Sequence, residues 1–275
     1  RYTVMEADGK RSIDYITDGD GKIREIHADS KAWGGRNPEF MNPRPDMTYV
    51  ADGNYTFRTD EYGRTVEAEG SLHLSENHRN ETQQAQSGYD GEFYFNLLNE
   101  KHKNDFFETE GRWPEPGEVP QYQEVEFQGG HLFGTQFFGP GELLNMSPMR
   151  FDINQNRTNT AFSDRIPEEL GTIDGSFYNL ERSWRGLLKH GDKWHNFNNP
   201  DFNDGRWNDA IALKPGKPDI QVKITSEFDP NMPRIEHPPE SGKFIDPPPV
   251  EFRVDWSING VQMRPQRYSN LPPVE

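Results

Sequence analysis

Apolar and polar residues alternate over several short stretches at both ends of the chain, the period-two pattern of half-buried strands. Towards the start, ITDGDGKIREI (16–26) and YTFRTDEYGRTVEAEGSLHL (55–74) place Gly-containing turns between such stretches, which predicts two β-hairpins. Towards the end, IQVKITSEF (220–228) alternates as a strand, and FRVDWSINGV (252–261) alternates and ends in an Asn-Gly turn, a strong hairpin signal. Strands therefore flank the centre of the chain.

The centre of the chain carries the clearest helical pattern. In SFYNLERSWRGLLKHG (176–191) the apolar residues recur at helical spacing, Ser176 is a suitable N-cap and Gly191 a suitable stop. A short strand, EVEFQ (124–128), precedes two glycines and His131. The other segments are predicted as a short helix or loop (78–88), an irregular connector (101–122) and a Pro-rich loop (238–250). We predict an α+β fold with a mostly antiparallel sheet around a strand–loop–helix core.

Length and composition are those of a loop-rich protein with one sizeable core. Its 275 residues include 25 Gly and 22 Pro, and only 31% are hydrophobic. No apolar run is long enough to span a membrane. There is no internal repeat and no clear linker, so we predict a β-hairpin extension over 1–54 and one compact unit over 55–275. The chain opens at Arg1 without an apolar leader, and we expect it to be part of a longer protein.

Cysteine content and charge restrict the chemistry. The absence of cysteine excludes thiolate catalysis and sulfur-bound zinc, so any metal must be held by nitrogen or oxygen. The net charge of −16 argues against nucleic-acid binding, because contacts to phosphate need Lys and Arg. Charge is local, however: residues 145–190 contain six Lys or Arg and six Asp or Glu. The central window is therefore neutral within an acidic chain, which weakens the objection.

Four residues between positions 131 and 181 form a candidate site. His131 follows two glycines after a predicted strand, where a neutral imidazole could take a proton from water. Asn145 and Asn154 lie nine residues apart, and an amide oxygen suits Mg²⁺ without cancelling its charge. Glu181 lies on the predicted helix. Each residue alone also fits a structural role, as a hydrogen-bonded His, a turn Asn or a solvated Glu; the combination favours metal-assisted cleavage of a phosphodiester.

The same segments resemble the DNA/RNA non-specific endonucleases of the ββα-metal type. The family pattern runs DRGH, then S-N-[IL]-x-P-Q-x(3)-[LI]-N-x-G, then W-x-x-L-E. Here GGH (129–131), LNMSPMRFDINQN (144–156) and NLE (179–181) correspond in order. The resemblance implies that His131 is the general base and that Asn154 binds Mg²⁺, with Mn²⁺ as an alternative. It also implies that Glu181 holds the metal's water shell, and that Gly130 and Asn145 support the site.

The closer resemblance is to a branch found as toxin modules of bacterial secreted proteins. TDEYGRT (59–65), GGHLFG (129–134) and YNLERSW (178–184) fit that branch, and RVDWSINGV with RYSN (267–270) resembles its closing hairpin. HRNETQQ (78–84) is similar to its R-x(4)-Q stretch, which makes Arg79 a candidate phosphate-binding residue. Over roughly residues 55–270, the resemblance implies a toxin that is secreted or delivered into a target cell and a cognate immunity protein.

Three departures from the family pattern stand out. Gly129 replaces the arginine of DRGH, so a transition-state cation must come from elsewhere, with Arg79, Arg157 and Arg182 as candidates. Met149 replaces the glutamine of the middle block. About nineteen extra residues, roughly 157–176, separate Asn154 from Glu181.

The resulting hypothesis is a Mg²⁺-dependent, sugar-nonspecific endonuclease that leaves 5′-phosphate products. A second hypothesis is a catalytically inactive module of the same fold, whose acidic surface engages a basic protein. A third, a β-rich carbohydrate-binding or cell-surface domain, rests on the aromatic content of 12% and the hairpins, and leaves the three motif blocks unexplained.

Overall fold

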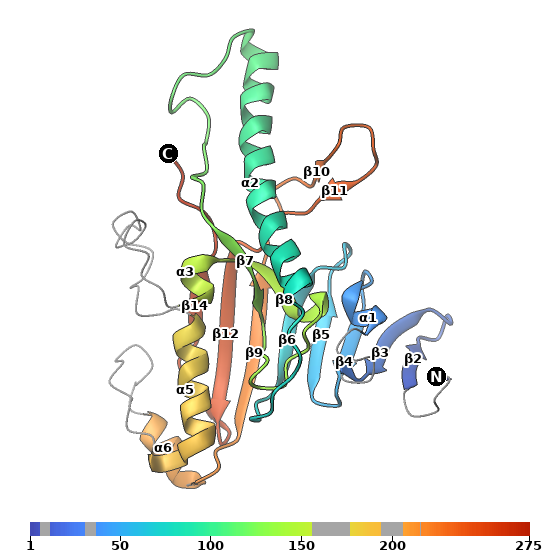
Figure 1. Ribbon diagram of the computed structural model, residues 1–275, viewed down its shortest axis with the longest axis vertical. Helices are drawn as coiled ribbons and strands as arrows, with labels where there is room; N and C mark the ends of the chain where they lie inside the picture. Colours follow the sequence, from blue (N-terminus) through green and yellow to red (C-terminus); the bar gives the residue numbers. More distant parts are fainter. Residues whose placement is uncertain (6–11, 31–36, 156–176, 194–205, 215) are drawn as a thin grey trace.

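A ten-stranded, mostly antiparallel sheet forms the body of the protein in a computed structural model, which describes residues 1–5, 12–30, 37–155, 177–193, 206–214 and 216–275 (Figure 1). The strand order is β1-β2-β3-β4-β5-β6-β9-β12-β13, with β14 also paired to β12. Its strands are β1 (Tyr2–Met5), β2 (Ser12–Thr17), β3 (Ile23–Ala28), β4 (Thr48–Ala51), β5 (Tyr55–Thr59), β6 (Thr65–Ser71), β9 (Ile220–Glu227), β12 (Glu251–Ile258), β13 (Val261–Gln262) and β14 (Gln266–Ser269). Only the β3–β4 pair is parallel among these described strands.

Helices and two smaller hairpins complete the fold. The small sheets pair β7 (Phe127–His131) with β8 (Met146–Arg150), and β10 (Ile235–Glu236) with β11 (Phe244–Ile245). The helical elements are α1 (Pro38–Met41), α2 (Glu81–Glu110), η2 (Leu143–Asn145), α3 (Phe151–Asn154), α5 (Phe177–His190), η4 (Gly191–Lys193) and α6 (Arg206–Leu213). The predicted mixed α+β class is confirmed. None of the described helices is long and apolar enough to cross a membrane.

Turn chemistry places the hairpins where the sequence predicts them. β2 pairs with β3, β5 with β6, and β12 with β13. The last turn uses Asn259 and Gly260 at φ 51° and 82°, the left-handed region that an Asn-Gly turn requires. The sheet also continues across the boundary predicted between residues 54 and 55, because all four residues of β4 pair with β5.

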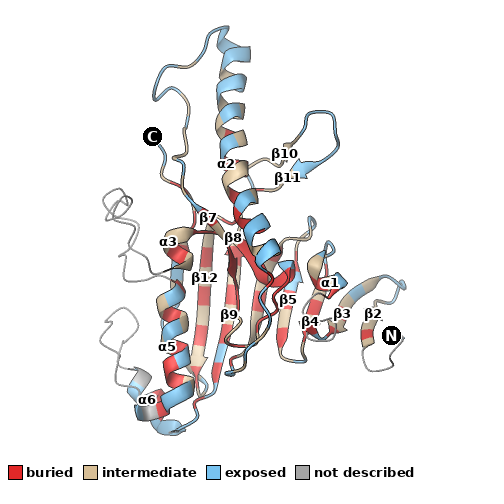
Figure 2. Cartoon of the chain, viewed as in Figure 1, coloured by how far each residue is buried: buried red, intermediate tan, exposed pale blue. Residues whose placement is uncertain are grey.

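Helix α2 is the largest departure from the predicted elements. The sequence predicted a short helix or loop at 78–88 and a connector over 101–122, but one 30-residue helix spans 81–110. Asn80 caps its start by accepting a hydrogen bond from the Gln83 N–H, and Gly111 ends it at φ 69°. The buried residues of α2 all lie between Ser87 and Leu98, so the helix beyond Leu98 has no buried apolar stripe to signal it (Figure 2). The strand predicted at 124–128 also differs, since β7 begins at Phe127 and runs through both glycines.

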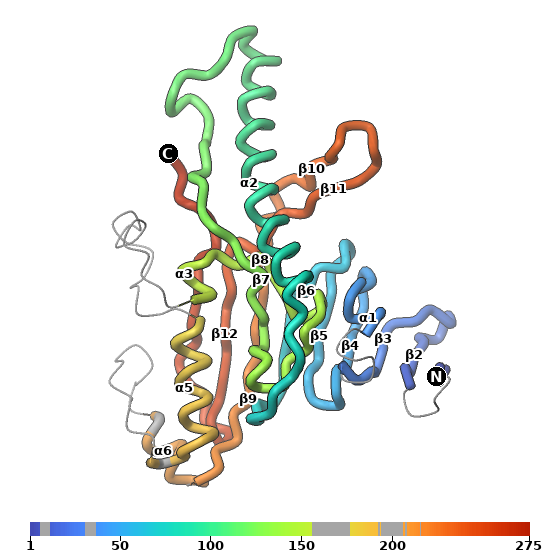
Figure 3. Tube along the Cα trace, in the orientation of Figure 1, coloured from blue at the N-terminus to red at the C-terminus, as the bar shows by residue number. Residues whose placement is uncertain are grey.

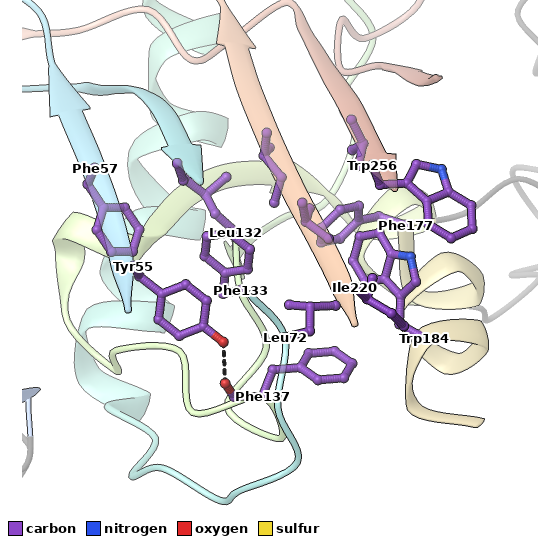
Figure 4. Packing of buried hydrophobic residues seen from close by; sticks show 14 of the residues in the cluster. Tyr55, Phe57, Leu72, Leu132, Phe133, Phe137, Phe177, Trp184, Ile220 and Trp256 are labelled. Atoms are coloured by element: carbon purple, nitrogen blue, oxygen red, sulfur yellow. Dashed lines mark hydrogen bonds between the residues drawn. The ribbon is translucent and has the colours of Figure 1, made fainter. Parts of the chain in front are cut away.

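The main core lies between one face of the sheet and a layer formed by α5 and residues 132–145. Burial along β9 and β12 alternates as the sequence pattern requires. Trp184 of α5 packs edge-on against Trp256 of β12, with ring centroids 5.9 Å apart (Figure 4). On the other side of this core, the Tyr55 hydroxyl donates a hydrogen bond to the carbonyl of Phe137. These contacts fix α5 and the 132–145 segment on the same sheet face.

Helix α2 packs on the β7–β8 hairpin through a second apolar cluster (Figure 3). Tyr94, Phe95 and Leu98 of the helix meet Phe127 of β7. Gly88 lets the two elements approach closely, since a Cβ there would lie 2.6 Å from the Phe127 carbonyl oxygen. The first half of α2 is therefore clamped on the hairpin that carries His131.

Candidate active site

His131 is the last residue of β7 and lies opposite Met146 of β8. It is 8% exposed, and its Nε2 is buried without a hydrogen-bond partner in the described part of the chain. Burial, assisted by the positive charge of Arg79, lowers the pKa of His131 to about 4. The imidazole is therefore neutral at pH 7, with one ring nitrogen left unsatisfied inside the protein. Such a nitrogen is available to a water or a substrate group.

Glu181 reaches the same region from α5. Its Oε1 accepts a hydrogen bond from the backbone N–H of Gly134 at 3.0 Å, three residues beyond His131. Burial raises the pKa of Glu181 to about 8, although the Gly134 hydrogen bond and the charge of Arg79 oppose the rise. The structure thus ties Glu181 to the loop that follows His131. The extra segment predicted between Asn154 and Glu181 lies outside the described residues.

Asn145 fixes the chain between His131 and Gly134. Its side chain is fully buried; the Oδ1 accepts from the Phe133 N–H at 2.9 Å, and the Nδ2 donates to the carbonyls of Phe133 and Pro140, each at 2.8 Å. The Asn145 carbonyl also accepts from the Leu132 N–H. The residue therefore satisfies backbone groups on both sides of the loop.

Asn154 ends the short helix α3, which contacts both β7 and α5. Its Nδ2 donates to the Oε1 of Gln128 at 3.1 Å, and Gln155 donates to the same oxygen at 2.6 Å. The Oδ1 of Asn154 makes no hydrogen bond with another described residue, so it remains available as a ligand. The sequence did not identify Gln128 as part of this arrangement; its only signal is its place immediately before Gly129 in the first motif block.

Arg79 is exposed and directly precedes Asn80, the N-cap of α2. Its charge adds to the depression of the His131 pKa and opposes the rise of the Glu181 pKa. No ion pair joins it to another residue in the described ranges. Of the other cations considered from the sequence, Arg182 is exposed on α5 beside Glu181, and Arg157 lies outside the described residues.

The packing of α2 accounts for the missing arginine at Gly129. A Cβ at this position would lie 2.4 Å from the carbonyl oxygen of Gln84, a backbone atom of α2. No larger side chain fits there unless the helix moves. At Gly130 a Cβ would lie 2.9 Å from the Cβ and the sulfur of Met149. The two substituted positions therefore belong to one packed layer of α2, β7 and β8.

Tyr268 of β14 is a further neighbour of Glu181 that the sequence did not single out. Its hydroxyl is buried and makes no hydrogen bond within the described structure. Burial, and then the charge of Glu181, raise the pKa of Tyr268. Its ring packs edge-on against Phe177, one turn before Glu181 on α5. The hydroxyl is thus a neutral donor beside the carboxyl group.

The donor set suits a hard cation that keeps most of its water. The described residues contain no group of three or more His, Asp or Glu side chains placed to bind a metal. One amide oxygen and one carboxylate are nevertheless hard ligands of the type that Mg²⁺ accepts while retaining several waters. The Oδ1 of Asn154 and the half-buried carboxyl of Glu181 are oxygen donors, a ligand type that fits Mg²⁺ better than a soft metal. No known protein-family model matches the chain.

Proposed function

We propose that this protein is a Mg²⁺-dependent endonuclease that hydrolyses DNA or RNA phosphodiesters to 5′-phosphate products and serves as a secreted bacterial toxin. One arrangement carries the proposal. The loop that follows His131, with its unpartnered buried nitrogen, is hydrogen-bonded through Gly134 to Glu181, and the charge of Arg79 acts on both side chains. In this proposal β7, β8 and α5 form the ββα-metal unit, with α3 contributing Asn154.

His131 would act as the general base. A pKa near 4 makes it a weak base in the empty site, but keeps it unprotonated at every physiological pH. Part of the depression comes from Arg79, and a bound phosphate would offset that charge. Substrate binding would therefore raise the basicity of His131 when a water is to be deprotonated.

Asn154 and Glu181 would hold the cation. Bound Mg²⁺ supplies electrostatic stabilisation of charge on the phosphate oxygens and the leaving O3′. Because Asn154 is neutral, its amide oxygen takes none of the cation's charge away from the substrate. Burial, and then the charge of Glu181, raise the pKa of Tyr268, so its buried hydroxyl would stay neutral near that carboxyl group.

Arg79 would take the place of the arginine that the family pattern has at position 129. Helix α2 fills the space into which a side chain at 129 would project, and the same helix begins immediately after Arg79. Helix α2 thus excludes an arginine side chain at position 129, and Arg79, next to the N-cap of the same helix, would supply the positive charge instead.

The test is digestion of plasmid DNA and of RNA by the purified protein, with Mg²⁺ and with EDTA. Wild-type protein should cleave only with the metal, and His131→Ala should lose at least about a hundredfold in rate, the usual contribution of a general base. His102→Ala, on α2, is the matched control and should cleave normally. Wild-type rates for His131→Ala, with unchanged thermal unfolding, would exclude the assigned base.

A second function is favoured by the charge of −16 and by the end of α2. Residues 104–118 include five acidic residues and one arginine, together with Phe107 and Trp113, which stack with centroids 4.6 Å apart and are 40% and 59% exposed. A catalytically inactive module could grip a basic protein through this surface. Calorimetry without any Mg²⁺ binding, together with a protein partner that requires Trp113, would favour this function over the nuclease.

A further inference from the structure

The outward side of α5 carries a row of one aromatic and three basic residues. Tyr178, Arg182, Arg185 and Lys189 follow one another at steps of four, three and four residues, which places them on one face of the helix. All four are exposed, and Tyr178 is 44% exposed. The opposite side, with Leu180, Trp184 and Leu187, is buried against the sheet. We call these four exposed residues the α5 row.

The α5 row has no ion-pair partners in the described structure. Exposed arginines elsewhere, such as Arg58 and Arg112, are paired with glutamates. From 177 to 193 the sequence has four Lys or Arg against Glu181 and Asp192, a local charge of +2 in a chain of −16. The rest of the chain therefore carries −18. In so acidic a protein, an unpaired basic row marks a place where an anion can approach.

The α5 row also adjoins the candidate site. Glu181 lies between Tyr178 and Arg182 in sequence. Its carboxyl group faces Gly134, whereas Tyr178 and Arg182 are exposed to solvent. The helix rises about 1.5 Å per residue, so Arg182 and Lys189 are separated by roughly 10 Å along the axis. One strand of a nucleic acid carries a phosphate about every 3.4 Å along a duplex axis, so this length corresponds to roughly three phosphates.

We propose that the α5 row is the track for the substrate strand: Arg182, Arg185 and Lys189 bind successive phosphates, and Tyr178 offers a ring on which a base stacks. This inference rests on the proposed nuclease function, and it names the polynucleotide backbone as the ligand. It also explains how a protein with a charge of −16 holds a polyanion, since the contact is confined to one helix face. Contacts to phosphate alone give no sequence preference, which suits a non-specific enzyme.

A solvated helix face with dipole-stabilising cations is the simpler explanation of the same residues. It accounts for Lys189, which lies in the last turn of α5, where a cation interacts favourably with the helix dipole. It does not account for Arg182 and Arg185, which lie in the middle of the helix and have no acidic partner among the described residues. The two explanations differ in what happens to nucleic-acid affinity when the row is neutralised.

The test measures binding separately from cleavage. A fluorescein-labelled 20-nucleotide single-stranded DNA is titrated with the intact chain in EDTA, over a series of salt concentrations. The triple variant Arg182→Ala, Arg185→Ala, Lys189→Ala should bind at least about tenfold more weakly. Its plot of log K against log salt should be shallower by about two, because three phosphate contacts are lost. The matched control, Lys22→Ala, Lys103→Ala, Lys243→Ala, removes the same charge from exposed sites on other elements and should bind as wild type.

A charge-preserving variant, Arg182→Lys with Arg185→Lys, guards against a folding artefact and should retain most of the affinity and the salt slope. Equal affinity for wild type and the Ala triple variant, or an equal loss in the control, would overturn the track. A loss of binding confined to the Ala triple variant, in a wild-type protein that never cleaves with Mg²⁺, would support the track and refute the proposed nuclease. If wild type cleaves and the Ala triple variant binds as wild type does, the proposed nuclease would be supported and the track refuted.

Discussion

The backbone N–H of Gly134 donates to the Oε1 of Glu181 at 3.0 Å, and a Cβ on Gly134 would lie 2.5 Å from that same oxygen. One short contact therefore joins the loop after His131 to helix α5, and leaves no room for a side chain. The contact sets the position of the carboxyl group relative to His131. Position 134 is consequently sensitive to a change of a single methyl group.

Gly134→Ala is predicted to displace the Glu181 carboxyl and weaken Mg²⁺ binding at the proposed site. Substitutions around a metal ligand commonly cost about 10- to 100-fold in metal affinity or activity, and we expect a loss in that range. The measurement is Mg²⁺ affinity by calorimetry together with the cleavage rate. Gly19→Ala is the control, since a Cβ at Gly19 meets nothing within 4 Å. Equal Mg²⁺ affinity in both variants would show that Glu181 does not contribute to the site.

Glu181 is predicted to make stability fall as the pH rises. Its pKa in the folded protein, about 8, lies above the ordinary value of 4.5, so the folded state binds the proton more tightly than the unfolded state. The stabilisation is complete below about pH 4.5 and is lost as the pH rises through about 8. In metal-free buffer, urea unfolding at pH 5, 7 and 9 should show a decline on the order of a few kcal/mol from this group.

Glu181→Gln separates this contribution from the other titrating groups. The amide oxygen can still accept from the Gly134 N–H, but it does not ionise. The difference in free energy of unfolding between wild type and the variant should change over the window from pH 4.5 to 8, with the variant relatively more stable at pH 9. A difference that is constant with pH would show that Glu181 titrates normally.

Metal binding is predicted to be linked to a proton on Glu181. A carboxylate ligand must be ionised, so below pH 8 the binding of Mg²⁺ should release a proton, and affinity should rise by up to about tenfold per pH unit. Titration calorimetry at pH 6.5 and 8.5, in buffers with different ionisation enthalpies, measures both effects. Glu181→Gln should bind more weakly and without proton release. Proton release that persists in this variant would assign the linkage to another group.

The elements that the sequence predicts well are those in which local and tertiary signals agree. Helix α5 has an apolar stripe that is buried against the sheet, and the Asn259-Gly260 turn needs left-handed residues that it contains. Helix α2 was missed beyond its start because residues 103–110 have no buried stripe to reveal the helical period. The helix ends at the C-cap Gly111, and only the part up to Leu98 contributes buried residues.

For the candidate site, the sequence likewise predicts one part, the identity of the residues, and does not predict another, their surroundings. Residue types and their order identified His131, Asn154 and Glu181 as candidates, but their environment depends on contacts distant in sequence. The pKa values of about 4 and about 8 arise from burial by the sheet, α2 and α5, which no local pattern encodes. The absence of arginine at Gly129 has a physical reason only when the Gln84 backbone is seen beside it.

Asn145 is predicted to be a structural residue, so its replacement should lower the free energy of unfolding. Asn145→Ala would leave the Phe133 N–H and the carbonyls of Phe133 and Pro140 buried without these partners. Buried unsatisfied groups cost roughly 1–3 kcal/mol each, and partial relaxation should limit the total to roughly 2–4 kcal/mol. Urea unfolding measures the loss, and Asn104→Ala, at an exposed position of α2, should change stability by less than about 0.5 kcal/mol.

Asn145→Asp keeps one acceptor but loses both donors, so it should also destabilise the protein. If both variants at position 145 unfold like wild type yet fail to cleave, Asn145 contacts the substrate or the metal instead of holding the loop.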